Sequence, residues 1–462
     1  MAVNINFPES LQMSAKISAP ASGLATRFRS DNASYSAGDI IRIEIPCSQP
    51  GATYLLPNDC YLSFDFNHVW SGGATNVRVD GSAYSFFRRA RVIHGANVLC
   101  DTNHCGRLFN ALRDITVPSS ARSVDEIRLA VAPFATQLQT ANGMAGLALT
   151  SGQTYDAAFP LPLPIVGTLQ KSAVPLSLMA SSLYIELEVA PMNQIFTNRV
   201  FSDADGAPPA LALTSYSQSS FTISNIYYNA KLTTVEPAYN AALMSVYAGR
   251  PLMLPASTYL SEMKVIPAGA STINEKMAFS VSSCNGILWW LSNSNVANGV
   301  AYDTSGGLLD GTTHRQSGDL AEYYIALSGK NLQPVYCGRN GTILGLSNTF
   351  IKGANSVNQI GRIYDNMSTV DGMGILNLIN YCSGVLDTAA DAAATSKRFV
   401  GAYSLEKYDT SNRYSSGESL IGQDVRVVAT MTTALTSNQN LYAYALAEIG
   451  FELIDGQLNL RS

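Results

Sequence analysis

Short runs in which apolar and polar residues alternate recur along this chain, and they limit its fold more than any other feature. In Ile40–Ile45 the isoleucines at odd positions share one face, while Arg42 and Glu44 lie on the other. The segment Leu183–Val189 alternates in the same way. Because side chains point to opposite faces with a period of two, such runs predict β-strands that are buried on one side.

These strand patterns form two successive series, and the second series begins after a helical pattern at Pro237–Gly249. That segment is rich in alanine, with a proline at its start and a glycine at its end, as helices often have. The predicted strands are 40–45, 61–66, 91–99 (two strands with a turn), 183–189 and 221–232, then 259–266, 277–283, 286–291, 332–337, 425–433 and 441–453. With roughly 14 to 16 strands and few helices, the chain fits tandem antiparallel sandwiches. The second unit is inferred from strand count and from the 237–249 boundary.

We therefore divide the chain of 462 residues into four parts. Residues 1–30 are expected to be an N-terminal arm, 31–236 a first β-unit, 237–250 a linker helix, and 251–462 a second β-unit. Two further short helices are predicted. One has an apolar stripe from Leu108 to Ile115, and the other begins with the capping-box pair Asp319 and Glu322 and ends at Gly329. The long, weakly patterned stretches 116–157, 191–219 and 295–320 are expected to be loops.

The low share of charged residues, 14%, points to a surface rich in uncharged polar side chains. Such a surface suits a protein that buries much of its outside against other copies, although a secreted or glycosylated β-protein is an alternative. The net charge of −5 gives no support to broad binding of nucleic acid, despite a local basic cluster at Arg88–Arg91.

The seven cysteines are odd in number and widely scattered. With no signal peptide recognisable at the N-terminus, we expect them to be reduced thiols of an intracellular product. No apolar run reaches the length of about 18 residues that a membrane helix needs.

No set of residues predicts catalysis, a cofactor or a metal. The chain lacks G-x-S-x-G, H-E-x-x-H and G-x-x-x-x-G-K-[ST] motifs. Cys100, His104 and Cys105 lie close in sequence but match no common zinc spacing, so buried thiols acting as small apolar groups are the stronger interpretation. A nucleophilic pair such as Cys105 with His94 has equally little support. A glycosidase-type pair of carboxylates from distant strands stays open.

The adjacent residues Trp289 and Trp290 are the candidate site of this chain. In a strand, one indole faces the core and the next points outward. Tryptophan is enriched at interfaces, so the outward indole is a candidate contact between subunits.

Two segments of the first β-unit stand out, SYSAGDIIRIEIP (34–46) and AYSFFRRARVIHGANVL (83–99). They are accompanied in order by 55–64, Leu161-Pro162-Leu163 with Gly167, Pro175-Leu176, 183–189, 221–235 and, more weakly, 331–336. Taken in this order, the segments resemble those of double jelly-roll major capsid proteins, most closely the group found in polinton-like viruses, adintoviruses and virophages. The resemblance covers most of residues 30–290 and thins afterwards, and relatives often carry an acidic residue where this chain has Cys100.

The resemblance implies two eight-stranded antiparallel jelly rolls side by side in each chain. Three chains would form a trimer with a pseudo-hexagonal outline, which tiles an icosahedral shell around a DNA genome. The long connections would form outward loops, and residues 1–30 would lie beneath and tie capsomers together. The partners would be further copies of the chain, then minor capsid and penton proteins, and the protein would be located in the virion. Whether a membrane underlies the shell is left undetermined.

Two alternatives remain at this stage. A glycan-binding or glycan-cleaving β-sandwich would use exposed tryptophan and tyrosine to stack on sugars. A minor capsid or spike protein of a similar virus would share much of the sequence pattern.

Overall fold

The computed structural model describes most of the β-structure of the chain. The described residues are 21–47, 52–69, 78–79, 82–116, 149–197, 220–238, 241, 245, 250–293, 320–331, 337–338, 401–405, 417–431, 434–435 and 438–461. The predicted loops 116–157, 191–219 and 295–320, and strand 332–337, lie largely outside them. None of the helices in this described part is long and apolar enough to cross a membrane.

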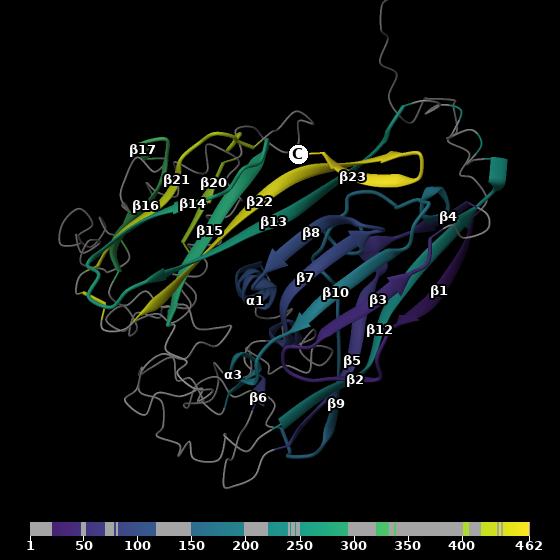
Figure 1. The fold of residues 1–462 in the computed structure, drawn as a ribbon, viewed down its shortest axis with the longest axis horizontal. Helices are drawn as coiled ribbons and strands as arrows, with labels where there is room; N and C mark the ends of the chain where they lie inside the picture. Colours follow the sequence, from purple (N-terminus) through teal and green to yellow (C-terminus); the bar gives the residue numbers. More distant parts are fainter. Residues whose placement is uncertain are drawn as a thin grey trace, which may run out of the picture.

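Two sheets built from the first half of the chain form a sandwich (Figure 1). One sheet has the order β1-β12-β5-β9, with β2 and β4 also paired to β12, and the other has the order β3-β10-β7-β8. The strands are β1 (Ala21–Arg29), β2 (Ser34–Tyr35), β3 (Ile40–Ile45), β4 (Ala52–Leu55), β5 (Tyr61–Val69), β7 (Phe87–His94), β8 (Asn97–Asn103), β9 (Thr154–Phe159), β10 (Leu183–Val189) and β12 (Ser220–Val235). A small ribbon pairs β6 (Arg78–Val79) with β11 (Phe196–Thr197).

The second half repeats this design. One sheet has the order β13-β22-β15-β20, with β23 paired to β22, and the other has the order β14-β21-β16-β17, with β18 paired to β16. The strands are β13 (Leu252–Ile266), β14 (Thr272–Met277), β15 (Cys284–Asn293), β16 (Leu320–Leu327), β17 (Lys330–Asn331), β18 (Cys337–Gly338), β20 (Gly401–Ser404), β21 (Val425–Met431), β22 (Gln439–Ile454) and β23 (Gln457–Arg461).

Both halves have the same strand connectivity. When the short β2, β4, β6, β11, β18 and β23 are set aside, the described residues of each sheet pair form eight strands in succession. In each half the first strand pairs with the eighth, the eighth with the third and the third with the sixth. The second likewise pairs with the seventh, the seventh with the fourth and the fourth with the fifth. This antiparallel arrangement is the jelly roll, and its repetition confirms the predicted double jelly roll.

The cores follow the alternation seen in the sequence. Ile41, Ile43 and Ile45 of β3 are all 0% exposed, and β10 alternates buried and half-buried residues throughout. Aromatic side chains fill the first roll. Phe64, for example, meets Phe86 and Phe87 edge-on at centroid distances of 5.2 and 5.6 Å. The buried residues of the two rolls belong to one continuous cluster, so the rolls share a core rather than merely touching.

Helix α1 (Cys105–Thr116) confirms the helix expected from Leu108 to Ile115. Between the rolls, residues 237, 238, 241 and 245 are helical, and the rest of the predicted linker 237–249 lies outside the described residues. The shorter helical turns are the 3-10 segments Pro57–Asp59, Ala83–Phe86 and Leu176–Leu178, and α3 (Met192–Ile195).

Three expectations differ from the structure. Residues 21–29, placed in the arm, form β1 and pair along their whole length with β12. The capping-box helix from Asp319 to Gly329 is wrong, because β16 pairs with β21 over most of this segment and Ser328-Gly329 turns the chain with positive φ. The β-branched and aromatic residues there favour a strand, and capping-box pairs are frequent by chance. The strand expected at 277–283 is also wrong, because β14 spans Thr272–Met277 and ends where the expected strand would begin.

Candidate functional site: the junction between the rolls

The two tryptophans lie on β15, and neither is exposed. Both indoles have 0% relative exposure, so the expectation that one of them faces solvent is wrong. Trp289 points into the second roll, where a Cβ placed on Gly401 would lie 2.3 Å from the indole nitrogen. Trp290, on the opposite face of β15, stacks on Tyr444 with ring centroids 5.0 Å apart. In this structure neither indole is available for contact with another subunit.

The face of β15 and β22 that carries Trp290 is covered by α1 of the first roll. The guanidinium carbon of Arg107 lies 4.7 Å from the ring centroid of Tyr442, and Arg107 Nη1 donates to Ser292 Oγ at 3.4 Å. The hydroxyl of Tyr444 donates to the carbonyl of His104 at 3.1 Å. The side chain of Trp290, which points out of the second roll, is therefore buried at the junction between the two rolls.

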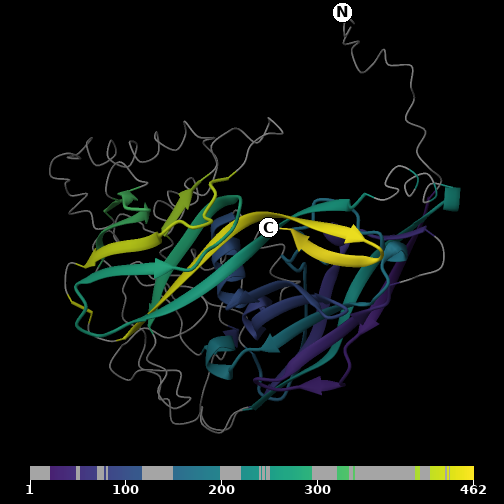
Figure 2. The same cartoon turned by 45° about the horizontal axis from the view of Figure 1, so that its top comes forward.

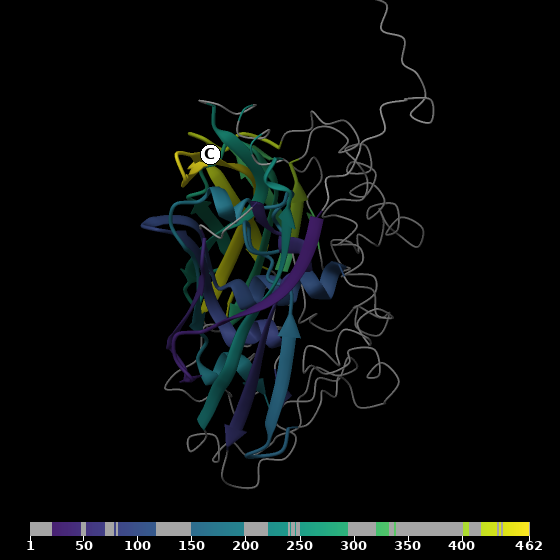
Figure 3. The ribbon, with the colours of Figure 1, turned by 90° about the vertical axis from the view of Figure 1, so that its right-hand side faces the viewer.

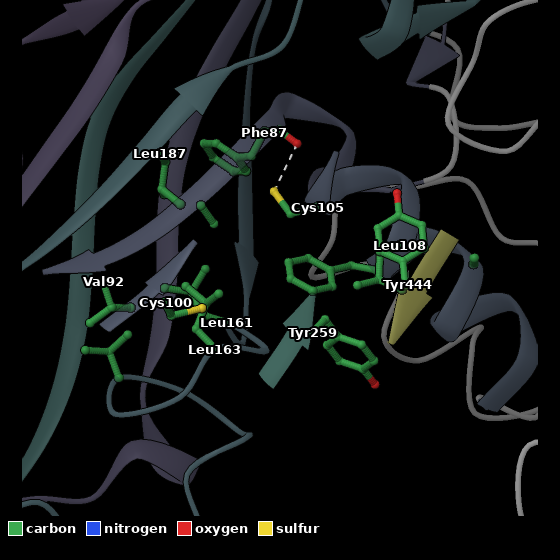
Figure 4. Close-up of a cluster of buried hydrophobic side chains, with 14 of the residues drawn as sticks. Phe87, Val92, Cys100, Cys105, Leu108, Leu161, Leu163, Leu187, Tyr259 and Tyr444 are labelled. Atoms are coloured by element: carbon green, nitrogen blue, oxygen red, sulfur yellow. Dashed lines mark hydrogen bonds between the residues drawn. The ribbon is translucent and has the colours of Figure 1, made fainter. Parts of the chain in front are cut away.

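Burial at this junction controls the charges of its groups. Desolvation, with the positive charges of Arg107 and Arg88, lowers the pKa of His104 to about 3, so its imidazole is neutral at physiological pH. Burial likewise raises the pKa of Tyr444. Figure 4 shows Tyr444 and Tyr259 of the second roll lying among Leu108, Cys105 and Cys100 of the first. The junction is thus largely apolar, with a few directed polar contacts.

Strand β8 makes the second set of contacts, with β13. Thr102 Oγ1 donates to the carbonyl of Tyr259 at 3.3 Å, and the backbone N–H of Asn103 donates to Ser261 Oγ at 2.9 Å. Cys100 Sγ lies 3.4 Å from the hydroxyl of Thr258. These bonds satisfy polar groups that the junction would otherwise bury unpaired.

The C-terminal hairpin makes the third set of contacts. Strands β22 and β23, in yellow, reach over the first roll beside β8 (Figure 2). Leu458 N–H donates to Nδ1 of the buried His94 at 3.3 Å, and Asn97 Nδ2 donates to the Leu458 carbonyl at 3.3 Å. Burial lowers the pKa of His94, which keeps Nδ1 free to accept.

A loop of the first roll caps the edge of β13. Lys171 N–H donates to the carbonyl of Pro255 at 3.2 Å, and Ser257 N–H donates to the carbonyl of Leu169 at 2.9 Å. Lys171 Nζ also reaches Glu448 at 2.6 Å. The outer edge of the second roll's first strand is therefore paired within the chain at residues 255–257.

The residues weighed for chemistry serve in packing instead. Cys105 is 1% exposed and donates to the carbonyl of Phe87 at 3.4 Å, and burial raises the pKa of the Cys100 and Cys105 thiols. A thiol with a raised pKa is a poor nucleophile and a poor metal ligand. Among the described residues no group of three or more histidine, cysteine or acidic side chains could hold a metal ion.

The basic cluster at Arg88–Arg91 is balanced by carboxylates on the outer face of β3-β10-β7-β8. Arg91 lies 2.7 Å from Glu186, Arg88 lies 3.6 Å from Glu188, and Arg89 forms a two-bond ion pair with Asp101. These neighbours of opposite charge leave little excess positive potential for a phosphate backbone. They also hold Glu186 and Glu188 of β10 in ion pairs.

Sequence reasoning missed the residues that join the rolls. Arg107 lies on α1 and His104 directly precedes it, but nothing in their spacing indicates a partner more than 300 residues away, as Tyr444 is from His104. The glycine at position 106 is the one local signal in the sequence for the position of this helix. A Cβ there would lie 2.5 Å from the Tyr84 carbonyl oxygen, so the helix start packs closely on the first roll.

Comparison with known proteins gives a fold but no sequence family. No family model matches the chain, and no curated protein matches it. Among solved structures, the Sputnik virophage gives a TM-score of 0.58 at 11% identity, over 100% of this chain and 93% of the other. The PBCV-1 virus capsid gives 0.55 at 11% identity, over 98% and 99%. The Faustovirus major capsid protein gives 0.55 at 9% identity, over 96% and 92%. At these identities the likeness establishes a shared fold over the whole chain.

Proposed function

We propose that this chain is a major capsid protein, a structural subunit that forms pseudo-hexameric trimers and tiles an icosahedral shell around a DNA genome. The observation that carries the proposal is the pair of jelly rolls with identical strand order, held side by side by one shared core. Three such chains would present six similar units around one axis. The same fold over the full length of the PBCV-1 and Faustovirus capsid chains supports this proposal.

A role without catalysis agrees with the chemistry of the described residues. Their buried thiols have raised pKa values and their buried histidines lowered ones, which suits packing better than proton transfer. We therefore expect no enzymatic activity and no cofactor. The expected partners are other copies of the chain, with minor capsid and penton proteins at the edges and vertices. The expected location is the virion.

The glycan alternative loses its main support. Sugar stacking needs exposed aromatic rings, and Trp289 and Trp290 are enclosed on both faces of β15. A minor capsid or spike protein would be distinguished by its low copy number in purified particles.

Size-exclusion chromatography with light scattering tests the proposal directly. The expected mass is three times that of one chain, and negative-stain images should show particles with a hexagonal outline. A protein that stays strictly monomeric at high concentration would contradict the proposed function.

A further inference from the structure

The hairpin of β22 and β23 lies on the first roll, against the turn between β7 and β8 and the start of β10. Ala180 N–H, just before β10, donates to the carbonyl of Gly456 at 2.9 Å. A Cβ placed on Gly456 would lie 2.8 Å from the Cβ of Ala180, so the tip of the hairpin is in close contact with the first roll. Figures 1 and 3 show the hairpin, in yellow, near the top of the molecule.

Strand β23 adds a bond in which a histidine must act as the acceptor. Leu458 N–H donates to Nδ1 of His94, the last residue of β7, at 3.3 Å, and both residues are 0% exposed. A backbone N–H can only donate, so Nδ1 carries a lone pair and the imidazole is neutral. A protonated imidazole has an N–H on both nitrogens and would set one donor against another. This bond therefore exists only while His94 is uncharged.

The surroundings of His94 disfavour a positive charge. Burial lowers its pKa, and the backbone of Ser181, which favours the charged form, has the smaller effect. Cys100 of β8 stays a neutral thiol because burial raises its pKa. Leu183, opposite His94 on β10, belongs to the apolar core, and Asp455 at the tip of the hairpin is exposed. The other charged side chains on these strands are engaged with one another, as Arg91 with Glu186, Arg89 with Asp101, Arg461 with Glu452, and Arg42 with the Tyr184 ring.

We infer that the hairpin is an acid-sensitive latch between the rolls, which releases from the first roll when His94 takes up a proton. A docked hairpin would have to bury the added charge and lose the Leu458–His94 bond, whereas release lets water solvate both groups. The released state binds the proton more readily, so docking is strongest above the ordinary histidine pKa of 6.5 and weakens as the pH falls below it. The latch is a property of the single chain and goes beyond the proposed function. In a shell of such chains, acid would loosen each subunit from within.

Amide hydrogen exchange of the full chain at pH 7.5 and pH 5.0 tests the latch, with each rate divided by the intrinsic rate at that pH. Acidification should raise the fraction of released hairpin about 10- to 30-fold. The protection of the Leu458 and Ala180 amides should fall together by that factor, because both of their bonds cross the contact. The amide of Ile185, inside β10, should change less.

His94→Asn separates the titration from the contact. Its side-chain carbonyl can still accept from Leu458 N–H but takes up no proton, so protection should change less than about 3-fold between the two pH values. His68→Phe is the matched control. His68 is another buried histidine with a lowered pKa, but it stacks on Phe196 within the first roll. This variant should keep the full pH effect at Leu458 and Ala180.

Three results would overturn the inference: wild-type protection that does not change with pH, an equal loss in wild type and His94→Asn, or a loss at Leu458 that Ala180 does not share. If His94→Asn is already unprotected at pH 7.5, His94→Gln, with the same acceptor on a longer side chain, takes its place. If neither variant docks, the wild-type comparison of Leu458 and Ala180 with Ile185 decides. These readouts do not depend on the oligomeric state, so failure of the latch leaves the capsid function standing, and a monomeric chain leaves the latch standing.

Discussion

The guanidinium of Arg107 lies over the ring of Tyr442, with its central carbon 4.7 Å from the ring centroid. This contact joins the helix that follows β8 in the first roll to the last long strand of the second. Arg107 is only 2% exposed, so its charge interacts with the ring at a site largely shielded from water. The relative position of the two rolls depends on such contacts.

Replacing Tyr442 with leucine should weaken the junction. The variant removes a buried ring and the surface that Arg107 covers, so unfolding in urea should show a loss of about 2–4 kcal/mol. Tyr442→Phe is the control. It keeps the ring and loses only a hydroxyl that accepts from Asn440 at 3.4 Å, so it should cost less than about 1 kcal/mol. Equal losses from both variants would argue against a role for the ring.

Gly401→Ala should be destabilising because the new methyl group would overlap the indole of Trp289. Overpacking of this kind costs about 2 kcal/mol. In a double-mutant cycle, Trp289→Phe should relieve part of the cost by shortening the side chain, so the double variant should be more stable than the sum of the single effects. Strict additivity would mean that the two residues do not interact.

Stability should fall as the pH drops from 7 to 5, in part because of His68. Burial lowers the pKa of His68 to about 4, while its ordinary value is 6.5. The unfolded chain therefore takes up the proton first, and stability present above pH 6.5 is lost as the pH falls toward 4.

Comparison with His68→Phe isolates this contribution. Between pH 7 and pH 5, wild type should lose about 2 kcal/mol more unfolding free energy than the variant, measured in urea at one protein concentration. His68 stacks on Phe196 with ring centroids 4.1 Å apart, and taking the difference between the two pH values cancels any change in this packing. Parallel pH profiles would show that His68 does not stay neutral in the folded chain.

The buried thiols should resist alkylation. Burial raises the pKa of Cys284 to about 12 and that of Cys105 still further, so neither forms a thiolate at neutral pH. Iodoacetamide at pH 7.5 should leave both unmodified in the native protein and label both in urea, as read by peptide mass spectrometry. Rapid labelling of native Cys105 would revive the nucleophile hypothesis that the structure argues against.

Much of the first roll could be predicted from the sequence because its strands are half-buried. Alternation in Ile40–Ile45 and Leu183–Val189 follows from one face meeting the core and the other meeting water. The same reasoning failed at Trp289 and Trp290. Both faces of β15 are buried there, one in the second roll and one against α1, and a doubly buried strand has no alternation to read.

The amino-acid sequence by itself determined the antiparallel β-class and most strand positions, because these follow from local periodicity and turn residues. It did not determine β1, whose exposed face carries a weak pattern, or the strand at 320–327. Only the tertiary structure decided which roll surfaces are covered. Leu24 and Leu254 each lie on the first strand of a roll and pair with its last long strand, yet Leu24 is 59% exposed and Leu254 only 3%. The difference depends on what lies across from each, and that is set by packing between segments far apart in the chain.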